Sequence, residues 1–271
     1  MKEKITLWVE RAWEFLKVTA GTLKIYLKAA ADFLLPRTCI VCGCKLNLRE
    51  RHLCLQCLME MPLTYFWQQA HNPMADRFND LIQKDVGERK ERYAYAAALF
   101  IYRGEAPYKK IPYHIKYQGD ISAGRYFGNM LGSKMADCPH FDDVDLIIPV
   151  PLHWLRRLKR GYNQASVIAD GLASALGAPV STDLLVRMKR TATQTKLGLE
   201  AKADNVKGAF TVAHDKMQAI LESGPPRHVL LIDDVFTTGS TLLACFTALR
   251  EVFPASEVRI SVATLGFVGR A

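Results

Sequence analysis

The chain has 271 residues, a formal net charge of +9, 49% hydrophobic residues and 23% charged residues. This composition is ordinary for a globular protein, and the length allows one sizeable core plus a small accessory unit. The charge suits an anionic partner such as a phosphorylated ligand, a nucleic acid or an anionic membrane surface, although many proteins are mildly basic for no specific reason. Seven cysteines, an odd number with two Cys-x-x-Cys pairs, argue against a disulfide framework and for a reducing compartment.

Residues 1–35 are predicted to form one amphipathic helix that ends at Pro36, with apolar side chains at helical spacing and a mixed acidic and basic face. The helix could pack on its own protein or on a second copy, giving a homo-oligomer through 1–35. Alternatively, it could bind a membrane surface or a partner protein. The segment shows no signal peptide, and its longest early uncharged run, 18–23, is far too short to span a membrane. We therefore expect a cytoplasmic protein without a transmembrane segment.

Residues 36–62 are predicted to form a small unit that resembles a double zinc ribbon. Its two Cys-x-x-Cys pairs are eleven residues apart, and their members are Cys39, Cys42, Cys54 and Cys57. Four soft thiolate ligands suit tetrahedral zinc, and four protein ligands leave no open position, so the zinc would be structural. The alternatives are free buried thiols, an iron–sulfur cluster or a redox pair. Cys44 or His52 lies close enough in sequence to replace one of the four ligands.

Residues 63–90 carry few periodic signals and are predicted to be a connecting segment with a turn at Asn72-Pro73. From 91 to 271 strands and helices alternate. Strands are predicted at 93–102, 144–150, 229–232 and 258–267, and helices at 121–136, 162–176 and after residue 241. The alternation predicts an α/β domain over 91–271, with a parallel sheet flanked by helices. Ligands of such sheets bind beyond the carboxyl ends of the strands.

The most informative segment runs from 229 to 241. It contains a branched apolar strand, then Asp233 and Asp234, then a hydroxyl-rich turn that leads into a helix. The turn residues are Thr237, Thr238, Gly239, Ser240 and Thr241. Backbone N–H groups, hydroxyls and the helix dipole would together bind a phosphate. Two carboxylates beside a phosphate would repel it unless they hold sugar hydroxyls or a hydrated divalent cation. The segment therefore predicts a site for a phosphorylated sugar, and an ordinary strand–turn–helix with capping threonines is the alternative.

Two further segments could contribute to this site. The strand that ends at Pro149-Val-Pro151 is followed by four cations within 156–160, among them Arg160, which could receive a second phosphate group or could be a solvated basic loop. Lys116 precedes the helix at 121–136 and could face the same site or lie on the surface. The polar, basic segment 187–210 is long for a connection, which suits a mobile lid over a charged substrate.

The segment 229–241 resembles the phosphoribosyl-pyrophosphate (PRPP) signature of type I phosphoribosyltransferases. The resemblance implies that Asp233 and Asp234 hold the ribose hydroxyls, directly or through Mg²⁺, and that the residues from 237 to 241 wrap the 5′-phosphate. It also implies that the turn containing Pro151 and Arg160 holds pyrophosphate.

The complete order of motifs is similar to that of the ComF family of bacterial competence proteins, which have a phosphoribosyltransferase-like domain behind a zinc ribbon. These motifs are the two cysteine pairs, Lys-Tyr-x-Gly, Pro-Val-Pro, Arg-Gly-Tyr-Asn-Gln, Asn-x-x-Gly-Ala-Phe and the signature. The family usually has Arg where this chain has Lys202. The resemblance implies an accessory role in DNA uptake, with single-stranded DNA and a helicase as partners. The alternatives are an active phosphoribosyltransferase of nucleotide salvage or related metabolism, and a PRPP sensor without turnover. The chain lacks the N-terminal cysteine nucleophile of an amidophosphoribosyltransferase.

Overall fold

The computed structural model describes residues 36–87, 90–103, 106–188 and 208–269. They belong to two compact units, one ending at Glu60 and one beginning at Met61. The helix predicted at 1–35, Lys202 and most of the lid predicted at 187–210 lie outside the described residues. Within the described ranges, no helix combines the length and the apolar character that a membrane span needs.

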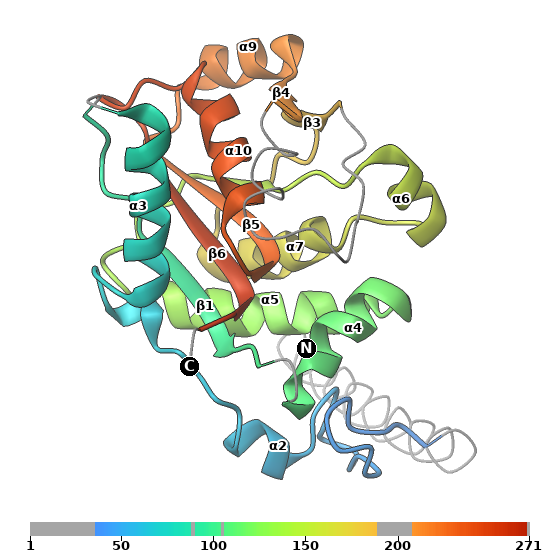
Figure 1. Cartoon of the computed structure of the whole chain (residues 1–271). Coiled ribbons are helices and arrows are strands. Elements are labelled where there is room, and N and C mark those ends of the chain that lie inside the picture. The colour runs from blue at the N-terminus through green and yellow to red at the C-terminus, as the bar shows by residue number, and fades with distance from the viewer. Residues whose placement is uncertain (1–35, 88–89, 104–105, 189–207, 270–271) are drawn as a thin grey trace, which may run out of the picture. The chain divides into compact units, whose positions relative to one another are not determined.

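The second unit is built on a four-stranded parallel sheet with the strand order β1-β6-β5-β2 (Figure 1). The strands are β1 (Ala96–Ile101), β2 (Leu146–Pro149), β5 (His228–Phe236) and β6 (Arg259–Phe267). In the register, Leu146 lies opposite Val229 and His228 lies opposite Arg259. Their side chains are buried almost without alternation, because helices cover both faces of the sheet. The predicted α/β fold with a parallel sheet flanked by helices is confirmed.

Helices pack on both faces of this sheet (Figure 1). One face carries α5 (Ile121–Met135) and α7 (Gln164–Leu176), and the other carries α3 (Pro73–Val86) and α10 (Ser240–Arg250). The remaining elements of this unit are η1 (Phe66–Gln68), η2 (Pro107–Lys109), α4 (Lys110–Tyr117), α6 (Trp154–Arg160), α9 (His214–Ser223) and the antiparallel pair β3 (Leu185–Arg187) and β4 (Phe210–Val212). The segment predicted to be a lid begins at the last residue of β3 and ends at the first residue of β4.

The segment 63–90, predicted to be a connection, contains the helix α3 instead. The side chain of Asn72 caps this helix by accepting hydrogen bonds from the backbone N–H groups of Met74 and Ala75, and Pro73 occupies its first turn. Met74, Phe78 and Ile82 recur at four-residue spacing and are buried in the core. The prediction at Asn72-Pro73 recognised a turn but not the helix start that this turn caps.

Three shorter differences concern the predicted site. The strand β5 continues through both aspartates to Phe236 rather than ending at them. The basic segment expected to be a loop forms the short helix α6, and Lys116 lies in the last turn of the short helix α4. Helices of seven and eight residues are too short to show a clear apolar periodicity in the sequence.

Glycines allow α5 and α7 to pack unusually closely. A Cβ atom added to Gly128 of α5 would lie 2.2 Å from the carbonyl oxygen of Ile168, and one added to Gly171 of α7 would lie 2.2 Å from the carbonyl oxygen of Arg125. Gly124 and Gly132 lie one turn to either side of Gly128, so three glycines line the face of α5 that meets α7. This contact positions the start of α7, which follows the candidate basic segment.

We predict that Gly128→Ala destabilises the fold by about 3 kcal/mol, because the added methyl group collides with backbone that cannot rotate away. Urea denaturation measures this loss. Gly269→Ala is the matched control, because its added Cβ would meet only the Phe267 ring, at an ordinary 3.6 Å, and should change stability by less than about 0.5 kcal/mol. Equal stabilities of the two variants would contradict the close-packing account.

Candidate functional site

The strand order brings the two predicted phosphate-binding segments to the same edge of the sheet. Since β2 and β5 are parallel neighbours, with Pro149 opposite Ile232, their carboxyl ends lie side by side. The N–H of Val150 donates to the carbonyl oxygen of Ile232 at 2.8 Å, and the side-chain amide of Asn163 donates to the carbonyl of Val150 at 2.9 Å. The turn that contains Pro151 is thereby fixed beside the end of β5.

The two adjacent aspartates point to opposite faces of the sheet, because successive side chains in a strand alternate. The side chain of Asp234 is 7% exposed and faces α4. Asp233 is within electrostatic reach of Arg187 on β3 and of Cys245 on α10, which lie toward the other face. Burial raises the pKa of Asp233, and the neighbouring Asp234 carboxylate raises it further, to about 7.

Lys116 forms an ion pair with Asp234, with 2.5 Å between Nζ and Oδ2. The lysine reaches the aspartate from the last turn of α4, more than a hundred residues away in sequence. Burial alone would lower the pKa of Lys116, but the carboxylates of Asp234 and Asp233 outweigh that effect and raise it. Lys116 is therefore charged, and the structure places it at the predicted site rather than on the outer surface.

A basic pocket of about 420 Å³ adjoins this ion pair. It is lined by Lys116, Tyr117, Gly119, Arg156, Lys159, Arg160 and Tyr162. The guanidinium of Arg160 lies 5.1 Å from the centre of the Tyr117 ring and donates a hydrogen bond to Gln164 Oε1 at 2.8 Å. The hydroxyl of Tyr162 donates to the carbonyl of Ile115 and thereby ties the basic segment to α4. Four cations around one hollow can bind a polyanion such as pyrophosphate.

The turn after β5 has the geometry of an anion-binding loop. Gly239 adopts a φ of +85°, and a Cβ atom there would collide with Leu81 and Phe236, so the position requires glycine. The hydroxyls of Thr238 and Ser240 lie 2.9 Å apart, and α10 begins at Ser240. A phosphate placed here would meet two hydroxyls and the positive end of an eleven-residue helix. Thr237 is exposed and Thr241 is partly buried in the first turn of α10.

Arg187 was predicted only as the first residue of the lid segment, and Tyr117 received no site role in the sequence analysis. Arg187 stacks on Phe210, with 5.2 Å from the guanidinium carbon to the ring centre, and burial together with the nearby Arg156 lowers its pKa. Tyr117 supports Arg160 through its ring. Both contacts join segments that are distant in sequence, so no local pattern indicates them.

The first unit brings its four cysteines together. The Sγ atoms of Cys39, Cys42, Cys54 and Cys57 all lie within 4.8 Å of one another, and those of Cys42 and Cys54 are 3.7 Å apart. Tetrahedral zinc with Zn–S bonds of about 2.3 Å requires sulfur separations of about 3.8 Å, so the cluster fits this ion. Cys44 and His52 are not part of this set of four.

Local backbone geometry explains how the cluster forms. Gly43, with a φ of +78°, donates its N–H to the carbonyl of Cys39 and closes the first turn. Cys54 caps the short helix α2 (Leu55–Met59), and its Sγ accepts a hydrogen bond from the N–H of Cys57. The backbone N–H of Cys44 lowers the pKa of the Cys42 thiol to about 6, which favours the thiolate that binds metal. The cluster can therefore hold a metal such as zinc.

Comparisons with known proteins support the family resemblance. The chain is 29% identical to "Competence protein F" of Haemophilus influenzae over 213 residues, which are 78% of this chain and 83% of that protein. It is 35% identical to "DNA utilization protein YhgH" of Salmonella typhi and 33% identical to that of Escherichia coli, each over 98 residues. The latter matches cover 40% of the YhgH proteins. No family model matches the chain.

The chain thus combines an α/β fold built on a parallel sheet with similarity to competence protein F over most of its length. The predicted resemblance to the ComF family is confirmed, since this chain is a homologue of competence protein F.

We predict that the purified protein carries about one zinc ion per chain and that Cys42→Ser loses it, because three thiolates bind zinc far more weakly than four. Metal content is measured by atomic emission after dialysis. Cys44→Ser is the matched control, since Cys44 is an exposed neighbour outside the cluster, and it should retain the zinc. A Cys42→Ser protein with undiminished zinc would show that Cys42 is not a required ligand of the ion.

Proposed function

We propose that this protein binds PRPP or a related ribose phosphate at the carboxyl end of β5, and that it acts in DNA uptake. The observation that carries the first part is the meeting of three segments around the ion pair of Lys116 and Asp234. Lys116, which lines the basic pocket, pairs with Asp234, and Asp234 stands three residues before the turn from Thr237 to Thr241. A ligand that carries a phosphate on one side of a sugar and a pyrophosphate on the other matches the sequence of turn, aspartates and basic pocket.

Each group of residues has a separate task in this proposal. The turn at 237–241 holds the 5′-phosphate through its hydroxyls and the N-terminus of α10. Asp233 and Asp234 accept hydrogen bonds from the ribose hydroxyls, directly or through Mg²⁺, and that ion would also neutralise the phosphates. Arg156, Lys159 and Arg160 hold the pyrophosphate. When the ligand binds, Lys116 can leave Asp234 and contact the pyrophosphate. The sugar or its cation then takes the place of Lys116 at Asp234, so the buried carboxylate keeps a partner.

The proposed role in DNA uptake rests on the names of the relatives and on one surface. The relatives are called competence protein F and DNA utilization protein. The helices α4 and α6 expose the aromatic side chains of Tyr113, Tyr117 and Trp154, which are 53%, 63% and 60% exposed. Basic residues lie between them and line a common pocket from both helices. Aromatic rings that stack on bases, next to cations that contact phosphates, are typical of proteins that bind single-stranded DNA. A helicase partner is carried over from the family resemblance alone.

An active phosphoribosyltransferase is the second candidate, and the intact aspartate pair beside the basic pocket favours it. In this reaction a nucleophile attacks C1 of the ribose, and pyrophosphate leaves with both electrons of the broken C–O bond. The four cations of the pocket would stabilise the leaving charge. Release of pyrophosphate from PRPP in the presence of candidate acceptors distinguishes this activity from binding alone.

We predict that PRPP with Mg²⁺ binds the wild-type protein and that Asp233→Asn weakens the binding at least about tenfold, because a neutral amide is a poor partner for the cation and the hydroxyls. Isothermal titration calorimetry measures both affinities. Asp142→Asn is the matched control, since Asp142 is an exposed carboxylate of the same unit, and it should bind as the wild type does.

The pH dependence provides a second readout on the same variants. The pKa of Asp233 is raised to about 7, so this carboxyl group is largely protonated at lower pH and must lose its proton to hold a cation. Affinity in the wild type should therefore rise from pH 6 to pH 8 by more than it rises in Asp233→Asn. Absence of any binding heat in the wild type at either pH would overturn the ribose-phosphate proposal.

We predict that Trp154→Ala and Tyr117→Ala each weaken binding of single-stranded DNA about fivefold or more, because each removes a ring on which a base can stack. Fluorescence anisotropy with a labelled oligonucleotide, repeated at several salt concentrations, measures the affinity. Leu221→Ala on α9 is an exposed apolar control away from this surface. Wild-type protein that fails to bind the oligonucleotide at low salt would contradict a direct role in handling DNA.

A further inference from the structure

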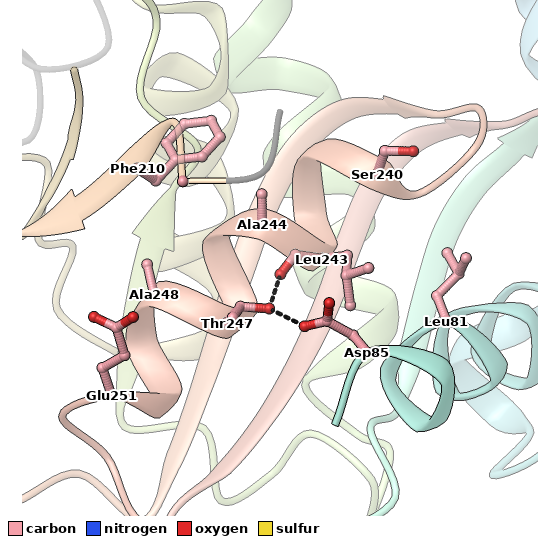
Figure 2. Close-up of a pocket in the computed structure, with 10 residues that line it drawn as sticks. Leu81, Asp85, Phe210, Ser240, Leu243, Ala244, Thr247, Ala248 and Glu251 are labelled. Carbon is pink, nitrogen blue, oxygen red and sulfur yellow. Dashed lines mark hydrogen bonds between the residues drawn. The ribbon is translucent and has the colours of Figure 1, made fainter. Parts of the chain in front are cut away.

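A second cavity, of about 220 Å³, lies on the other side of α10 from the core (Figure 2). Its walls come from the outer face of α10, the C-terminal half of α3 and the strand β4. Its main lining residues are Leu81, Asp85, Phe210, Leu243, Ala244 and Glu251. It shares no lining residue with the basic pocket next to Lys116.

The residue pattern of α10 explains why this space is open. One face of the helix carries Leu242, Phe246 and Leu249, which are buried in the core. The outer face is mixed, with Leu243, Thr247 and Glu251, and it carries the small residues Ala244 and Ala248 at its centre. Small side chains opposite the neighbouring α3 and β4 leave a hollow with apolar walls, rather than a packed helix–helix contact.

The polar groups of this cavity are oxygen atoms, and two of them belong to carboxylates. Asp85 Oδ2 accepts a hydrogen bond from the hydroxyl of Thr247 at 2.9 Å, and Figure 2 shows both side chains meeting at the wall between α3 and α10. Glu251 lies at the far end of the same helix face. Among the residues that the structure describes, the lining contains no Lys, Arg or His, although the whole chain has a charge of +9. A ligand of this cavity must therefore supply hydrogen-bond donors, and a positive charge would complement the carboxylates.

We propose that the cavity between α3, α10 and β4 is a binding site for a small organic cation with a flat apolar body, such as an aryl amidine or a benzylic amine. The apolar body packs between Leu81, Leu243 and Phe210, and the cationic N–H groups bond to the carboxylate of Asp85. This ligand is a cation, whereas the basic pocket next to Lys116 would bind an anion. One small molecule therefore does not suit both sites. The volume suits a ligand of this size rather than a nucleotide.

The location of the cavity also connects it to the turn at 237–241. Ser240 lines one end of the cavity, and its hydroxyl lies 2.9 Å from that of Thr238. Phe210 forms another wall and carries the stacked guanidinium of Arg187. An occupant would therefore contact Ser240 at the start of α10 and Phe210, whose ring carries Arg187, and Arg187 is within electrostatic reach of Asp233.

Benzamidine is a suitable probe, and its neutral isostere benzamide tests the charge. Ligand-observed NMR titration of the full chain should show benzamidine binding at millimolar concentrations and benzamide binding at least about tenfold more weakly. Asp85→Asn keeps an oxygen that can accept from Thr247 but removes the charge, so it should reduce the affinity for benzamidine by a similar factor. Ala244→Phe should fill the cavity and abolish binding of both compounds.

Lys216→Ala on the exposed face of α9 is the control that should bind as the wild type does. If Ala244→Phe does not fold, Asp85→Asn and the comparison with benzamide still decide the outcome. The proposal is overturned if benzamidine does not bind the wild type, if it binds Asp85→Asn equally well, or if benzamide binds as tightly as benzamidine.

Discussion

The ion pair between Lys116 and Asp234 is the interaction on which the arrangement of the candidate site depends. Asp234 is almost completely buried, and a buried carboxylate that loses its partner typically costs about 3–5 kcal/mol. The end of α4 must therefore stay beside the end of β5. Because Tyr117 and the rest of the basic pocket are built on that end of α4, the pair also fixes where a polyanion can bind relative to the aspartates.

Polar side chains have different surroundings at the two ends of the sheet. At the amino end the ring of His228 is completely buried and bonds to Asp143 and to the hydroxyl of Ser261, which in turn accepts from the N–H of Tyr95. The histidine of this network is held inside the fold, and burial lowers its pKa. At the carboxyl end the charged groups face a pocket instead. Charges that are held beside an open hollow are arranged for a ligand rather than for the fold alone.

The parallel sheet and the cysteine cluster were predictable from sequence because both rest on local patterns. Runs of branched apolar residues mark buried strands, and the spacing of Cys39 to Cys57 brings the thiols together. The helix α3 was not predicted, although the capping residue Asn72 and the spacing of Met74 and Phe78 are typical of a helix start. The contact of Lys116 with Asp234 and the stacking of Arg160 on Tyr117 join segments that are distant in sequence. No local sequence pattern indicates such a contact.

A crystal structure of the complex with PRPP and Mg²⁺ tests the central claim most directly. The account predicts that the 5′-phosphate lies in the turn at 237–241, that the ribose lies against Asp233 and Asp234, and that Lys116 Nζ has left Asp234 for the pyrophosphate. A complex in which Lys116 stays on Asp234 and the phosphates lie outside both the turn and the basic pocket would contradict it.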